Sequence, residues 1–144
     1  MTRRLFVLLP ALLLGSFLLA ACGAIGQQSS GTKLAPVSEL PQQMQDAPST
    51  VRTAYQFAVA NPDALENVPC YCGCGAIGHK SNLACYIKEF GSDGQPVFDD
   101  HAMGCSLCVD IATDVMQMAG EGKSPVEIRQ QIVSNYSQFG PANQ

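Results

Sequence analysis

A run of alternating cysteines decides how this chain is organised, and it reads Pro69-Cys70-Tyr71-Cys72-Gly73-Cys74-Gly75. In an extended segment, residues i and i+2 project to the same side. We therefore expect Cys70, Cys72 and Cys74 to present three thiols together, with the glycines letting the backbone fold them inward. Three convergent thiolates suit a soft metal ion such as Cu(I) or Zn(II). The run predicts a cysteine-rich loop that holds a metal, makes disulfides or carries redox chemistry.

A second cluster lies downstream and reads His101-Ala102-Met103-Gly104-Cys105-Ser106-Leu107-Cys108. A Cys-x-x-Cys at a helix start places both sulfurs within reach of one ion, and the helix N-terminus favours the thiolate. Imidazole and thioether groups are also acceptable to copper. The predicted metal ligands are Cys70, Cys72, Cys74, Cys85, Cys105 and Cys108, with His79, His101 and Met103 as second-tier ligands.

Three chemistries compete for these six thiols. Metal ligation by both clusters is the leading interpretation, with Cu(I) as the favoured cofactor and zinc as the second candidate. Six thiolates exceed one tetrahedral shell, so either some bridge two or more ions or two of them pair as a disulfide. An even set of six also leaves open a disulfide-stapled interaction domain without metal. The third alternative is a thiol-disulfide oxidoreductase using Cys105 and Cys108, although the strand–helix alternation typical of such enzymes is absent.

The N-terminus has the layout of a secretory signal, with Arg3 and Arg4 before an apolar run over residues 5–20. The run ends in Leu19-Ala20-Ala21-Cys22, which resembles the bacterial lipobox. We therefore predict a signal peptide over residues 1–21, lipidation of Cys22 and attachment to the extracytoplasmic face of the cell membrane. Residues 22–47, rich in Gly, Ser, Gln and Pro, are expected to be a flexible tether, and residues 48–140 the cysteine-rich domain.

Charge and motif content narrow the function. Without residues 1–21, six Lys and Arg face twelve Asp and Glu, a net charge near −6. This balance argues against nucleic acid as a partner and mildly favours a cation. No Ser/His/Asp arrangement, phosphate-binding glycine loop or zinc-protease motif occurs, so we expect a binding protein rather than an enzyme. Asp99 and Asp100 have the pattern of a solvated acidic pair. The expected partners are the membrane, through the lipid, and a protein that exchanges metal.

The remaining sequence predicts a mainly α-helical domain with a small irregular or β region. Helical spacing of apolar residues predicts a helix from Ser49 or Thr50, as N-cap, to about residue 60 and a longer one over about 103–119. Gly91-Ser92-Asp93-Gly94 predicts a turn joining residues 86–90 to 95–98 as a short hairpin. Ser124-Pro125-Val126-Glu127 combines an N-cap serine, a first-turn proline and a capping-box glutamate, so a last helix starts there. Its buried stripe is expected to be Ile128, Ile132 and Tyr136.

At these residues the chain resembles a family of bacterial exported lipoproteins named for a Pro-Cys-Tyr-Cys-Gly-Cys motif. The resemblance runs from about residue 54 to residue 136. It implies a heavy-metal site, for which copper is the ion usually suggested, and it implies no catalytic residue. The stretches that carry it are Pro69–Gly75, Gly78-His79-Lys80-Ser81-Asn82, Cys85-Tyr86, Gly104-Cys105, Cys108-Val109-Asp110, Gly122-Lys123-Ser124 and Glu127-Ile128-Arg129.

Overall fold

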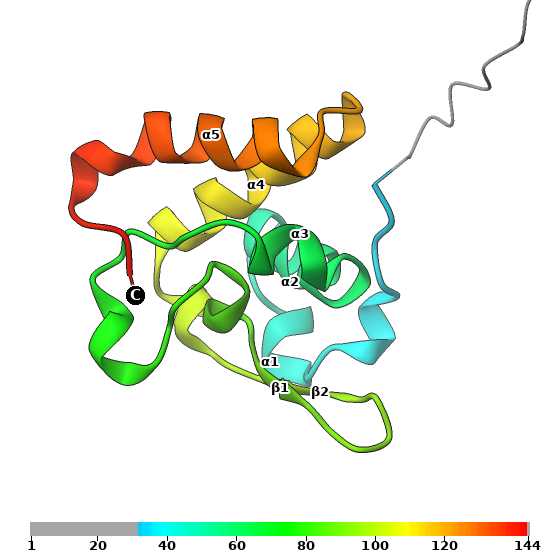
Figure 1. Cartoon of the computed structure of the whole chain (residues 1–144). Coiled ribbons are helices and arrows are strands. Elements are labelled where there is room, and N and C mark those ends of the chain that lie inside the picture. Colours follow the sequence, from blue (N-terminus) through cyan, green and yellow to red (C-terminus); the bar gives the residue numbers. More distant parts are fainter. Residues whose placement is uncertain (1–31, 144) are drawn as a thin grey trace, which may run out of the picture.

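The computed structural model describes residues 32–143, and within them the chain is mainly helical with one small β-hairpin (Figure 1). This confirms the predicted fold class. The α-helices are α1 (Gln42–Gln45), α2 (Ser49–Ala60), α3 (Pro62–Glu66), α4 (Ser106–Gly120) and α5 (Pro125–Tyr136). The strands are β1 (Ile87–Phe90) and β2 (Pro96–Phe98). Short 3-10 turns fill the connections: η1 (Val37–Glu39), η2 (Cys74–Ile77), η3 (Leu83–Cys85), η4 (His101–Met103) and η5 (Ser137–Phe139).

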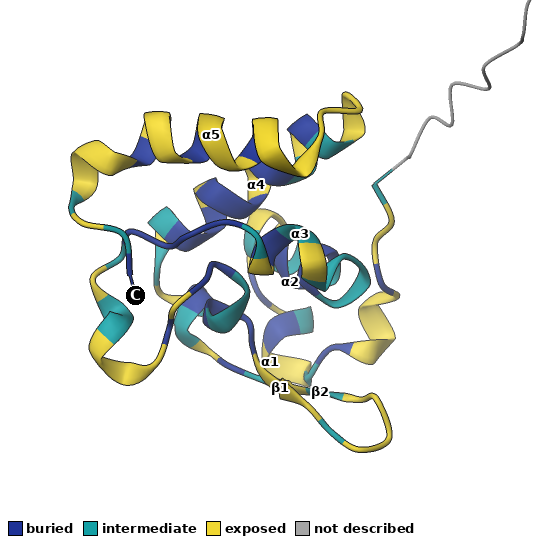
Figure 2. Cartoon of the chain, in the orientation of Figure 1, coloured by how far each residue is buried: buried dark blue, intermediate teal, exposed yellow. Residues whose placement is uncertain are grey.

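Helix α4 is the centre of the fold, because both α2 and α5 pack against it. Figure 2 shows the buried residues on the sides of these helices that face one another, with the exposed residues on the outside. On α4 the buried positions recur every three or four residues, as an apolar face should. They are Cys108, Val109, Ile111, Ala112, Val115 and Met118.

Helix α5 forms as its first four residues predict. The Ser124 hydroxyl accepts a hydrogen bond from the Glu127 amide, and the Glu127 side chain accepts one from the Ser124 amide. This capping box satisfies amides that would otherwise lack partners at the helix start. The expected stripe of Ile128, Ile132 and Tyr136 is buried.

The other two long helices depart from expectation at their starts. No serine or threonine side chain caps α2, because Pro48 is its N-cap residue. Helix α4 begins at Ser106, and Cys105 is its N-cap residue in an extended conformation. Residues 101–103 belong instead to η4, which Gly104 separates from α4. Cys105 therefore lies just before the helix and Cys108 on its first turn.

The hairpin is confirmed. Strands β1 and β2 pair antiparallel with Ile87 opposite Phe98 and Phe90 opposite Pro96, and an irregularity lies between Ile87 and Glu89. The Gly91 amide donates to the Gln95 carbonyl at 2.8 Å across the predicted turn. The hairpin brings residues 99–105 back toward the cysteine loop, because the Asp99 amide donates to the Tyr86 carbonyl at 2.8 Å.

The folded part begins earlier than expected. The segment 35–47, expected to be tether, packs on the domain, with Leu40 and Met44 almost fully buried in the core. The Ala35 amide donates to the Gln56 carbonyl of α2 at 3.0 Å. Two apolar side chains four residues apart are enough to hold this polar stretch against α2. Residues 22–31, the predicted signal peptide and Cys22 lie outside the described residues.

Candidate metal centre

Three fully buried cysteines form the inner part of the centre. They are Cys70, Cys85 and Cys108. The distance between Sγ atoms is 3.5 Å for Cys70 and Cys108, 3.6 Å for Cys70 and Cys85, and 3.2 Å for Cys85 and Cys108. A disulfide would require about 2.05 Å, and all six cysteines of the described residues are free. A tetrahedral zinc with bonds of about 2.3 Å would separate its sulfurs by about 3.8 Å. The three thiols are therefore close enough to one another to be ligands of one ion.

The fold brings these three thiols together from three separate segments. Cys70 follows α3 along an extended stretch, Cys85 ends η3, and Cys108 lies on the first turn of α4. The Asn82 amide donates to the Val68 carbonyl at 2.9 Å, which closes the cysteine loop, residues 69–86, on itself. The Tyr86 hydroxyl donates to the Cys108 carbonyl at 2.8 Å, which ties this loop to α4.

Cys72 and Cys105 lie at the edge of this trio and are half-buried. The sulfur of Cys72 lies within 4.8 Å of those of all three inner cysteines, so it can serve as the fourth ligand. The sulfur of Cys105 lies 3.2 Å from that of Cys108. Both halves of the site predicted from sequence therefore meet.

Cys74 is separated from Cys70, contrary to the expectation that the three alternating thiols face one ion. Gly73 adopts a left-handed conformation with φ of 79°, and the chain then enters η2 at Cys74. This turn carries the Cys74 sulfur to His101, whose Nε2 lies 3.1 Å away. A residue with a Cβ resists positive φ, so the glycine in Cys-Gly-Cys sets the direction of the third thiol.

The two histidines have different places. The His101 ring lies within 4.8 Å of cysteine sulfurs in two groups of possible metal ligands, whereas His79 belongs to no such group. His79 is buried, packs its ring edgewise on His101 with 4.9 Å between ring centroids, and has its Nε2 3.5 Å from an Asp99 carboxylate oxygen. Its Nδ1 is buried without a hydrogen-bond partner. His79 is thus placed behind His101 rather than among the sulfurs.

The expectation that Asp99 is part of a solvated acidic pair is wrong, because Asp99 is buried. One carboxylate oxygen accepts the His101 backbone amide at 2.8 Å, and the other faces His79 and, at 3.9 Å, the Lys88 ammonium. Met103, the remaining second-tier residue, is half-buried and packs against the apolar core.

The sulfur, nitrogen and oxygen atoms that could hold an ion fall into three overlapping sets, each with all its ligand atoms within 4.8 Å of one another. Cys72, Cys108 and His101 each belong to two of the sets, so the sets are joined into one centre. The sets are Cys70/Cys72/Cys85/Cys108, Cys72/Cys74/His101 and His101/Cys105/Cys108. No carboxylate belongs to any of them.

Two asparagines surround the sulfurs and were not predicted as site residues. The Asn82 side-chain amide is fully buried and donates to the Cys108 carbonyl at 3.2 Å, with the Cys70 sulfur 3.9 Å away. The Asn143 side-chain amide lies 3.6 Å from the Cys72 sulfur. Such N–H groups stabilise thiolate charge. Asn82 lies in a stretch that carries the family resemblance, whereas nothing in the sequence points to Asn143.

The protons of the inner thiols are strongly interdependent. Hydrogen bonds from the Cys108 and Cys85 thiols lower the pKa of Cys70 to about 2. The hydrogen bond between Cys108 and Cys70 raises the pKa of Cys108 far above its ordinary value, and the bond between Cys108 and Cys85 contributes the next largest increase. Burial raises the pKa of Cys72 to about 11. One thiolate therefore forms readily, and further ionisation requires a cation to replace the protons.

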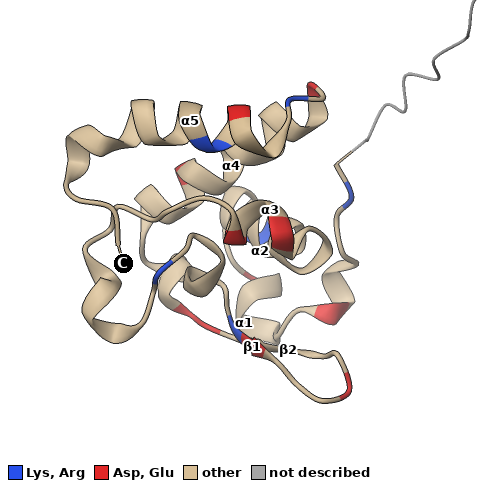
Figure 3. Ribbon diagram, in the orientation of Figure 1, with Lys and Arg blue, Asp and Glu red and all other residues tan. Residues whose placement is uncertain are grey.

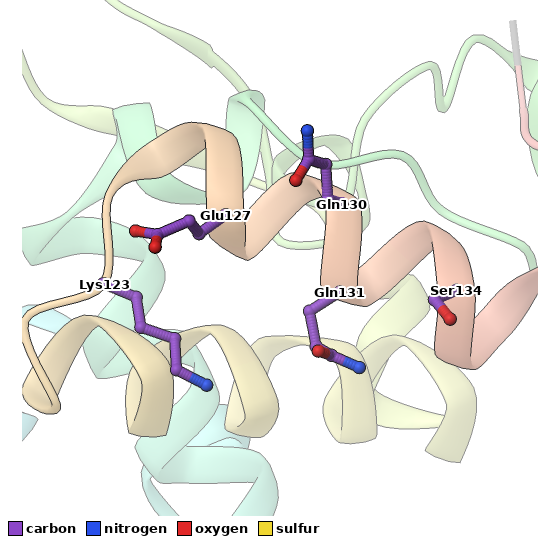
Figure 4. A pocket seen from close by; sticks show the side chains of 5 residues that line it. All are labelled: Lys123, Glu127, Gln130, Gln131 and Ser134. Atoms are coloured by element: carbon purple, nitrogen blue, oxygen red, sulfur yellow. The ribbon is translucent and has the colours of Figure 1, made fainter.

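A groove of about 310 Å³ lies along α5, and none of its lining residues is a cysteine (Figure 4). Its lining is polar and consists of Lys123, Glu127, Gln130, Gln131 and Ser134. Within residues 32–143, no helix has both the length and the apolar character that a membrane crossing requires.

The fold and the site together define a small helical domain built around a centre of six free cysteines. By sequence, the chain belongs to the family described as proteins of unknown function with a PCYCGC motif, which it matches over residues 12–143. This confirms the resemblance seen in the sequence. No curated protein and no solved structure matches the chain.

Proposed function

We propose that this protein is a lipid-anchored, extracytoplasmic metal-binding protein that captures, stores or hands over Cu(I), with zinc as the alternative ion. One observation carries the proposal, namely the convergence of the free, buried thiols of Cys70, Cys85 and Cys108 to within 3.2–3.6 Å of one another. Three buried thiols in contact gain little from one another without a cation. A shared ion would compensate the charge that their ionisation creates.

The choice of a soft ion rests on the donor atoms. The three ligand sets offer sulfur and imidazole nitrogen and no oxygen. Figure 3 shows the ribbon of η2 and its surroundings almost free of charged residues, and residues 69–79 contain none. Thiolate-rich sets select Cu(I) and zinc, whereas Mg²⁺ and Ca²⁺ take oxygen ligands.

The location and the partners rest on the sequence. The lipobox-like Leu19-Ala20-Ala21-Cys22 supports attachment of a lipid to Cys22, which would place the domain at the outer side of the cell membrane. A protein that hands over an ion requires a partner that receives or supplies it, and the acidic balance of the mature chain argues against nucleic acid in that role.

The test uses the full-length chain, purified in detergent without oxygen, with bound metal and free thiols quantified in the same sample. We expect bound copper or zinc and six metal-protected cysteines that become reactive when a chelator removes the ion. A protein with neither metal nor free thiols, before or after reconstitution with Cu(I), would refute the proposal. Labelling with a radioactive fatty acid, lost in Cys22→Ser, tests the anchor separately.

A thiol-disulfide oxidoreductase is the second candidate, and the Cys105–Cys108 pair favours it. Their sulfurs lie 3.2 Å apart at the start of α4, and Cys105 is the more accessible of the two. A helix N-terminus activates a cysteine by favouring its thiolate. This candidate predicts that metal-free protein reduces disulfide substrates repeatedly when a small thiol re-reduces its cysteines, and that Cys105→Ser abolishes the reaction.

A further inference from the structure

We infer that the centre holds a separate outer ion on Cys72, Cys74 and His101, and that this ion is the one exchanged with the surroundings. The inference rests on the proposed function and adds to it a division of labour. Under this division, the inner set of Cys70, Cys85 and Cys108 retains an ion, while the outer set receives and releases one. Cys72 belongs to both sets and joins them.

The outer ligands are close enough to share an ion without using the inner trio. The Cys74 sulfur and the His101 Nε2 are 3.1 Å apart, and both lie within 4.8 Å of the Cys72 sulfur. Two thiolates and one imidazole form a three-ligand set with room for a further ligand from outside. In this arrangement the Cys72 thiolate bridges the two ions, so the inner trio gains it as a fourth ligand and has no such vacancy. The two sets therefore differ in ligand type and in coordination number.

Burial separates the two sets further. The inner cysteines are fully buried, whereas Cys72, Cys74 and His101 are half-buried. Exposed residues of η2 and its end, including Ile77 at 68% exposure, border Cys74. An incoming thiol or chelator can approach Cys74 along this side, and it cannot reach Cys85 without moving the core.

Asp99 holds the backbone at His101, and His79 lies behind the His101 ring. The Asp99 carboxylate accepts the His101 backbone amide with one oxygen and faces His79 with the other. The His79 ring then packs edgewise against the His101 ring. A buried carboxylate on the backbone and a buried second histidine against the ring thus limit the movement of the imidazole that faces Cys74.

Exchange at the outer set is a ligand substitution without a change of oxidation state. On binding, Cu(I) displaces the protons of Cys72 and Cys74 to solvent and forms two copper–sulfur bonds and one copper–nitrogen bond. On release, a partner's thiolates enter one at a time, beginning at the open position, and replace Cys74, His101 and Cys72. All three copper bonds to this chain then break, and the Cys72 and Cys74 sulfurs regain protons from solvent. Because Cys72 also contacts the inner set, an ion can pass inward by forming a bond to Cys70 or Cys108 before it leaves Cys74.

The experiment titrates the reduced full-length protein in detergent with Cu(I) against a chromogenic chelator and records X-ray absorption at the copper edge. The double variant Cys74→Ser/His101→Gln should bind one ion fewer per chain than the wild type and lose the nitrogen contribution to the spectrum. His79→Gln keeps all three outer ligands, so it should keep both the ion and the nitrogen contribution while binding the outer ion more weakly. Ser81→Ala is the control and should match the wild type, because the Ser81 hydroxyl contacts Glu66 and no sulfur. Cys85→Ser should lose the inner ion, and if that variant does not fold, the wild-type spectrum still tests for nitrogen.

The outcomes separate this inference from the proposed function. A wild type that binds no Cu(I) refutes the function itself. A wild type that binds Cu(I) through sulfur alone, or a double variant with unchanged stoichiometry, leaves the function intact and overturns the outer site. Loss of the nitrogen contribution in His79→Gln but not in His101→Gln would make His79 the nitrogen ligand. That result would also overturn the outer site.

Discussion

The helical pair α4 and α5 and the cysteine loop, residues 69–86, are stabilised by different means. The pair is regular and held by apolar side chains and a capping box. The cysteine loop has two 3-10 turns and no longer element, and its contacts with α4 run through thiols, an asparagine amide and a tyrosine hydroxyl. The pair can form from apolar burial alone, whereas under the proposed function the loop depends on a bound cation to compensate its thiolates.

The largest expected effect is that of metal on the cysteine loop. Saturating Cu(I), at about a thousand times the dissociation constant, should raise the free energy of unfolding by about 4 kcal/mol. Native-state hydrogen exchange should slow most in residues 69–86 and least in α5, because the loop supplies most of the ligands and α5 supplies none. Removal of the ion with a chelator is the control and should restore both values. Equal protection in both regions would remove the distinction between them.

A cavity in the helical pair should lower the stability of the chain without changing how much copper it binds. Ile132 is fully buried on α5, so Ile132→Ala should lower the free energy of unfolding by about 2–5 kcal/mol. Copper stoichiometry should not change, because Ile132 lies in none of the ligand sets. Val133→Ala is the matched control, since Val133 is 39% exposed and its truncation should cost no more than about 0.5 kcal/mol. Urea unfolding and copper titration of both variants measure the two quantities.

The sequence predicted the regular elements best where a local signal and burial agree. Ser124 to Glu127 specify the start of α5 without reference to the rest of the chain, and the Gly91–Gly94 turn does the same for the hairpin. Segment 35–47 was misjudged, because its few apolar residues stand among prolines and polar side chains that are typical of a tether. Their burial depends on α2, which no local signal shows.

The composition of the centre was more predictable than its geometry. Ligand chemistry was enough to expect that residues 69–75 and 101–108 meet. The divergence of Cys74 from Cys70 depends on the left-handed Gly73, and a glycine allows that conformation without requiring it. The burial of Asp99 depends on the hairpin that brings it to His79. Both features arise from tertiary contacts.

Loss of a supporting amide should affect the cysteine loop and its ion together. Asn82→Ala removes the hydrogen bond to the Cys108 carbonyl, so the free energy of unfolding should fall by about 1–3 kcal/mol. Copper affinity should fall about 10-fold to 100-fold, as for other groups that support metal ligands. Ser81→Ala is the matched control, because its hydroxyl donates to Glu66 at 2.7 Å and contacts no sulfur. Unchanged affinity in Asn82→Ala would show that the amide supports the fold alone.

The smallest effect concerns the helical pair at alkaline pH. Burial, together with the hydrogen bond to Asp114, raises the pKa of Tyr136 above its ordinary value near 10. A raised pKa contributes stability that is fully present below about pH 10. That stability is lost as the pH rises further, because the unfolded chain ionises first. The wild type should therefore lose stability above pH 10 more steeply than Tyr136→Phe, by about 1.4 kcal/mol per pH unit.

Tyr136→Phe should itself cost about 1 kcal/mol at neutral pH through the lost hydrogen bond, so the two unfolding curves should converge as the pH rises. Asp114→Asn sharpens the test, since it keeps an acceptor for the Tyr136 hydroxyl and removes the charge that opposes ionisation. Its alkaline slope should lie between those of the wild type and Tyr136→Phe. Parallel slopes in all three proteins would mean that Tyr136 ionises as readily in the folded chain as in the unfolded one. In that case the contact between α4 and α5 would be looser than its burial indicates.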